Sequence, residues 1–148
     1  MPTPIEEVVE KLRASTALLN HAGDELNAIV REVEAFLDSC GIGVYAEVEV
    51  SREEDEEGTP RSYTSLGYYR IGSKFRIAIV EGDYRSDPEA KPWSDCPRFD
   101  RLHTAKKLPQ LISEITKQVE KSTLETRDVA AKLAQELKPI LKSGKAAK

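Results

Sequence analysis

One short segment carries side chains that could act as a nucleophile, a base or metal ligands. Asp95, Cys96, Asp100 and His103 are close together in the sequence. A structural zinc site needs four ligands, commonly in paired spacings such as Cys-x₂-Cys, and one cysteine with one histidine does not supply them. A thiol nucleophile needs a base beside it and a third group that orients the base. We therefore expect no metal site and no catalysis here, and an enzyme using this loop is the weakest hypothesis.

The rest of the chain adds no catalytic or cofactor-binding signature. The phosphate-loop motif G-x-x-x-x-G-K-[ST], the dinucleotide motif G-x-G-x-x-G and the zinc motif H-E-x-x-H are all absent from the sequence. Cys40 and Cys96 are far apart, which is typical of reduced thiols rather than of a disulfide framework. We expect a protein that is not an enzyme and that binds no cofactor.

A basic and aromatic stretch, SLGYYRIGSKFRIAIVEGDY at residues 65–84, is a better candidate for a binding surface. Tyr69, Arg70, Lys74 and Arg76 combine rings that could stack on bases with cations that could contact phosphates. These four are the candidate partner-binding residues. The stretch lacks an aromatic motif of the RNA-recognition type, so tyrosines that pack against a helix remain the favoured interpretation.

The same stretch has the pattern of a β-hairpin. Gly72 and Ser73 supply a two-residue turn that matches the twist of paired strands. A turn there pairs Ile71 with Lys74 and sorts the side chains onto two faces. One face carries Leu66, Tyr68, Phe75, Ile77 and Ile79, and the other carries Gly67, Tyr69, Arg76, Ala78 and Val80. We expect the first face to build the core.

The flanking segments complete a small predicted sheet. Residues 44–50 alternate between apolar and polar side chains, as in a strand with one buried face, and the acidic residues 51–61 indicate a loop. With the hairpin this predicts a three-stranded antiparallel meander. Prolines interrupt residues 81–101, so an irregular connection is expected, with Trp93 and Phe99 attaching it to the body.

Both ends of the chain have helical periodicity. Apolar residues recur every seven positions from Ile5 to Val33, with further apolar residues three and four positions later, which predicts a helix over about 5–38 with a weak point at Gly23. A second apolar stripe runs from Leu108 to Ile140, with a candidate break at residues 122–125, where STLE resembles a capping box.

Charge is distributed unevenly along the chain. Residues 1–60 hold 15 acidic and 4 basic side chains, whereas residues 102–148 hold 10 basic and 5 acidic ones. We expect the acidic first helix to lie antiparallel beside the basic last one. Such long arms would also favour pairing with a second copy into a four-helix bundle.

The sequence thus predicts one α+β domain over residues 1–143: a long N-terminal helix, a three-stranded antiparallel meander and a long C-terminal helix or helix pair. A disordered tail is predicted at 144–148. No apolar run approaches the length that spans a bilayer, and the acidic N-terminus does not resemble a signal peptide, so a cytoplasmic protein is expected. We expect an interaction protein that forms a homodimer, or binds another protein, through its helices. A nucleic-acid-binding module that uses the hairpin is the alternative.

Overall fold

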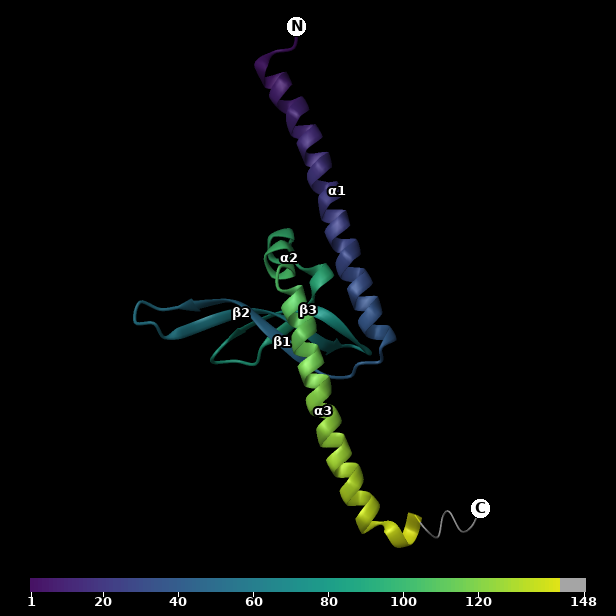
Figure 1. The fold of residues 1–148 in the computed structure, drawn as a ribbon. Coiled ribbons are helices and arrows are strands. Elements are labelled where there is room, and N and C mark those ends of the chain that lie inside the picture. The colour runs from purple at the N-terminus through teal and green to yellow at the C-terminus, as the bar shows by residue number, and fades with distance from the viewer. Residues whose placement is uncertain (142–148) are drawn as a thin grey trace.

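The computed structural model describes residues 1–141 and confirms the α+β class (Figure 1). The order of elements along the chain is α1 (Pro4–Ser39), β1 (Ala46–Glu54), β2 (Pro60–Ile71), β3 (Lys74–Asp83), β4 (Glu89–Pro92), the 3₁₀ turn η1 (Trp93–Asp95), α2 (Arg98–Ala105) and α3 (Leu108–Glu136). The predicted tail at 144–148 lies outside the described residues.

Helix α1 is continuous and begins with a complete capping box. The Thr3 hydroxyl accepts from the Glu6 amide at 3.2 Å, and the Glu6 carboxylate accepts from the Thr3 amide at 3.1 Å. The predicted weak point at Gly23 does not interrupt the helix. A glycine costs only about 1 kcal/mol within a helix, which the flanking helical residues offset. The chain leaves the helix at Gly41, whose φ of 67° is the left-handed conformation that glycine adopts easily.

Within residues 1–141 the sheet contains four antiparallel strands in the order β1-β2-β3-β4, so the prediction of three strands is wrong. The extra strand, β4, pairs with residues 78–81 of β3 at the sheet edge. Its last residue is Pro92, which lacks a backbone donor and is tolerated on an edge strand. The hairpin itself has the predicted register, with Ile71 opposite Lys74 and Gly67 opposite Ala78.

The segment predicted to be irregular, residues 81–101, also contains η1 and the first half of α2, which is a second correction. Trp93 holds this segment to the body: its side chain is 2% exposed, and its indole Nε1 donates to the Thr104 hydroxyl at 3.2 Å. Phe99, by contrast, is 75% exposed and does not attach the segment. Pro97 directly precedes α2 and fixes the extended backbone from which the helix starts.

The hydrophobic core lies between one face of the sheet and the two long helices. The sheet contributes the face predicted from the hairpin pattern, α1 contributes Val30 and Leu37, and α3 contributes Leu108, Leu111 and Ile115. Helix α3 runs unbroken through residues 122–125, contrary to the candidate break. Ser122, the candidate cap, lies inside α3, and its carbonyl accepts from the Thr126 hydroxyl one turn later at 2.7 Å.

The two long helices do not lie side by side as antiparallel arms, and this prediction is wrong. Helix α1 packs on β3, whereas α3 packs on β1 and β2. Their free halves project toward opposite ends of the molecule (Figure 1). Attraction between surface charges contributes only about 0–1 kcal/mol per pair, which is small beside the burial of each helix on the sheet. Within residues 1–141, no helix is both long enough and apolar enough to cross a membrane.

Candidate interaction surfaces

Tyr69 lies on the second face of the sheet, and its ring is not free to stack on a base. Its hydroxyl donates to the Glu47 carboxylate on β1, and its ring meets the edge of the Tyr45 ring with centroids 5.4 Å apart. Burial, followed by the hydrogen bond to Glu47, raises the pKa of Tyr69. A Cβ placed on Gly67 would lie 2.5 Å from the Tyr69 ring, so the ring lies directly on the bare glycine backbone. This side chain acts as part of the fold.

Arg76 is also engaged within the chain. Its Nε donates to the Glu34 carboxylate of α1 at 3.3 Å, and its Nη2 donates to the Ser94 hydroxyl at 3.2 Å. The other oxygen of Glu34 accepts from the Ile77 amide at 3.1 Å. Glu34 therefore joins α1 to the part of β3 that β4 leaves uncovered, and its charge is matched by that of Arg76.

Arg70 and Lys74 are exposed, but they do not extend a basic surface from Tyr69 and Arg76. Lys74 stands at the hairpin turn, and Arg70 is opposite Phe75 on the face that builds the core. The neighbours of Tyr69 on its own face include Glu47. The four candidate residues therefore do not form one cationic surface with an exposed ring.

The segment from Asp95 to His103 does not assemble a reactive site. The Cys96 thiol donates to the Pro92 carbonyl at 3.3 Å, and burial, aided by the Asp100 carboxylate, raises the pKa of this thiol. His103 is exposed and stacks on Phe99 with ring centroids 5.8 Å apart. In the described part of the chain, no group of three or more His, Cys, Asp or Glu side chains could hold a metal ion.

The most distinctive surface features are two apolar stripes that the sheet does not cover. In α1, the face that packs on the sheet at Val30 and Leu37 continues toward the N-terminus as exposed residues. In α3, the face that is buried at Leu111 and Ile115 continues toward the C-terminus in the same way. The exposed stripe residues are Ile5, Val8, Leu12 and Leu19 in the α1 arm; the α3 arm comprises Val129 and Leu133 of α3, together with Leu137 and Ile140, which lie beyond the end of α3 at Glu136. These two sets are called the α1 arm and the α3 arm below.

An apolar groove lies where the α1 arm joins the body, between α1 and α2. Its volume is about 120 Å³, and its apolar lining is Leu19, Ala22, Gly23, Leu26 and Leu102. A Cβ added to Gly23 would meet no atom within 4 Å, so the space beside this glycine is open. Arg98 and Arg101 of α2 also line the groove, together with Asn27.

The groove arginines are held by amides of α1. Arg98 Nη2 donates to Asn20 Oδ1 at 2.9 Å, and Arg101 Nη1 donates to Asn27 Oδ1 at 2.6 Å. Because both acceptors are uncharged, these contacts orient the guanidinium groups without cancelling their charge. The sequence did not predict this site because residues 98–101, the first half of α2, were assigned to an irregular connection. The signal that could have found it is the Arg-x-x-Arg-Leu spacing directly after Pro97, which suits a short helix.

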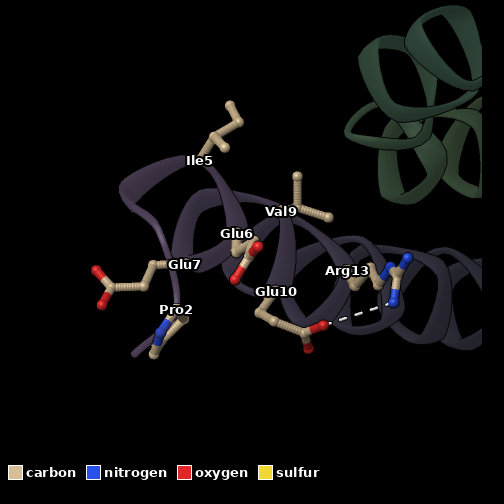
Figure 2. A pocket seen from close by; sticks show the side chains of 7 residues that line it. All are labelled: Pro2, Ile5, Glu6, Glu7, Val9, Glu10 and Arg13. Carbon is tan, nitrogen blue, oxygen red and sulfur yellow. Dashed lines mark hydrogen bonds and ion pairs between the residues drawn. The ribbon is translucent and has the colours of Figure 1, made fainter.

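The first turns of α1 form a surface with two different sides. Figure 2 shows Ile5 and Val9 projecting on one side of the helix, while Glu7 and Glu10 project on the other. Glu10 and Arg13 form an exposed ion pair of 3.5 Å. The hollow beside these side chains is lined by residues 2–13, so a single helical segment bounds it and it is open to solvent.

Comparisons of the chain with family models, with curated proteins and with solved structures found no match.

Proposed function

We propose that this chain is an interaction protein that self-associates through its helical arms and has no catalytic role. The observation that carries the proposal is the pair of uncovered apolar stripes. Leu12 is 63% exposed and Leu133 is 46% exposed, although each lies on the helix face that is buried elsewhere. Isolated apolar side chains are common on protein surfaces, but a stripe that continues a buried helix face is typical of an interface.

The arms are large enough to support association. The eight stripe residues are each partly exposed, and completing the burial of such a side chain contributes about 1 kcal/mol. A dimer would bury both sets, whereas association costs roughly 4–15 kcal/mol in lost freedom of motion. The free energy gained by burying these apolar side chains therefore exceeds the cost of association only if most of the stripe is buried. This favours pairing along the helices over a contact between a few residues.

Sedimentation equilibrium over a wide range of concentrations tests the proposal. We expect a dimer or higher oligomer at tens of micromolar for the native chain. A chain that remains monomeric throughout this range would contradict self-association.

The nucleic-acid alternative has less support, since only Arg70 and Lys74 of the four candidate residues are exposed and unpaired within residues 1–141. It requires an affinity for single-stranded nucleic acid that falls as salt is added, because neutralised phosphates release counterions. Absence of binding at low salt would remove this alternative.

A further inference from the structure

A small cavity lies away from both arms, where α1, β3 and η1 meet. Its volume is about 230 Å³. Val30 of α1 and Trp93 of η1 form its apolar wall, and both side chains are almost fully buried, at 4% and 2% exposure. The rest of the lining is polar and consists of Asn27, Arg31 and Glu34 of α1, Arg76 of β3 and Ser94 of η1. A concave site with a buried apolar wall and a few convergent polar groups is the usual form of a small-ligand site.

The polar side chains of this cavity offer mainly donors to a ligand. Both oxygens of the Glu34 carboxylate already accept hydrogen bonds, from Arg76 Nε at 3.3 Å and from a β3 backbone amide at 3.1 Å. Asn27 Oδ1 accepts from Arg101 Nη1 at 2.6 Å, so the amide nitrogen is the end of Asn27 that remains for a ligand. The Ser94 hydroxyl accepts from Arg76 Nη2 at 3.2 Å, which leaves its own hydrogen free to donate. A ligand of this cavity must therefore supply acceptors.

The cavity also has an excess of positive charge. Glu34 is paired with Arg76 at 3.3 Å, and Arg31 adds a second guanidinium group to the lining. A third guanidinium group, that of Arg101, lies over the Trp93 ring, 5.7 Å from the ring centroid. Within residues 1–141, the buried Nε of Arg101 has no hydrogen-bond partner. Three guanidinium groups and one carboxylate in and beside the cavity favour a negatively charged ligand, although the net charge of the whole chain is −4.

We propose that this cavity binds the oxyanion group, a carboxylate or a phosphate, of a small ligand. The oxyanion accepts from Arg31, from the Asn27 amide and from the Ser94 hydroxyl, and a short apolar part of the ligand rests on Val30 and Trp93. The cavity is smaller than the roughly 300–1,000 Å³ of pockets that hold drug-sized ligands, so the ligand is smaller than a nucleotide. Because none of these residues belongs to the arms, this site does not depend on the proposed self-association.

Trp93 provides the signal for a binding test, because it lines the cavity and is the single tryptophan of the chain. Phosphate and acetate are titrated separately, with sodium chloride adjusted to hold the ionic strength constant, since screening alone alters contacts between charges. We expect a saturable change in fluorescence with a Kd on the order of 1 mM for at least one anion. The anion that binds more tightly shows whether the site takes a tetrahedral or a planar group. Absence of a saturable change with both anions up to roughly 50 mM, together with absence of binding heat in calorimetry, would overturn the inference.

An isosteric substitution separates ligand binding from a structural role. Asn27→Asp keeps an acceptor for Arg101 but places a negative charge in the cavity, so it should raise the Kd at least about tenfold without lowering the urea midpoint. The matched control is Asn20→Asp, where the amide oxygen holds Arg98 outside the cavity, and it should change the Kd by less than about twofold. Arg31→Gln, at an exposed position, should raise the Kd about fivefold through loss of a charged donor. Equal affinity of the native chain, Asn27→Asp and Arg31→Gln would place the anion elsewhere and overturn the inference.

Discussion

Replacing Gly67 by alanine should displace the Tyr69 ring and destabilise the fold. The new Cβ would lie 2.5 Å and 2.7 Å from two ring carbons of Tyr69 and 3.2 Å from Val80 Cγ2. The ring must therefore move away from the position in which its hydroxyl donates to Glu47. A hydrogen bond to a charged group contributes about 1.5–3 kcal/mol, and the edge contact with Tyr45 about 0.5–1.5 kcal/mol.

Alanine also has a compensating effect, since it lowers the entropy cost of ordering a strand by about 0.5–1 kcal/mol relative to glycine. The expected net loss is about 2 kcal/mol in the free energy of unfolding. For a chain of this length, that loss lowers the urea midpoint by about 1 M. The single tryptophan, Trp93, is buried in the folded state and provides the fluorescence signal for the titration.

A double-mutant cycle separates this mechanism from general strain. If the tyrosine ring is the obstacle, Gly67→Ala should cost nothing in a Tyr69→Ala background, or should stabilise it slightly. A coupling energy near zero between the two substitutions would refute the reasoning, because it would show that the alanine is accommodated without moving the ring. All variants are compared at one chain concentration, so that self-association does not enter the difference.

Two further predictions concern the same body of the protein. Because the pKa of Tyr69 is raised in the folded state, the folded chain keeps this phenol proton at a pH where the unfolded chain has lost it, so the free energy of unfolding should fall as pH rises above about 10. The urea midpoint measured between about pH 8 and 11 should therefore decline less steeply in Tyr69→Phe than in the native chain. An equal decline in both chains would contradict this prediction. Leu111 is fully buried under the sheet, so Leu111→Ala should lower the free energy of unfolding by about 3 kcal/mol. Leu124→Ala, on the exposed side of α3, should change this free energy by less than about 0.5 kcal/mol. Equal losses for the two variants, measured by calorimetry, would argue against the described packing.

The parts of the fold that local sequence determines were predictable. The register of the hairpin follows from one two-residue turn and the alternation around it, because a shift by one residue would turn Leu66 and Ile77 away from the core. The helices follow from long apolar stripes. In both cases the signal repeats over many residues, so a single exception such as Gly23 does not erase it.

The parts that distant contacts determine were not predictable. Strand β4 has four residues and ends in a proline, and only its pairing with β3 makes it a strand. Helix α2 is positioned by the hydrogen bond from Trp93 to Thr104. The role of Tyr69 depends on Glu47, which the pairing of β1 with β2 brings beside it from 22 residues away. Composition identified an aromatic and basic stretch, but could not show which of its side chains the fold already uses.

The uncovered α1 arm has a consequence for how the chain becomes ordered. Most of the stability of a helix in a protein comes from its tertiary packing, and the first turns of α1 are supported locally by the capping box at Thr3 and by side-chain pairs such as Arg13 with Glu10. The backbone hydrogen bonds of the arm should therefore open and close far more often than those beneath the sheet, so that its amide hydrogens exchange early. If a partner covers the stripe, the helical turns of the arm become fully ordered only when that partner binds. The entropy lost in ordering the arm then lowers the affinity of the complex.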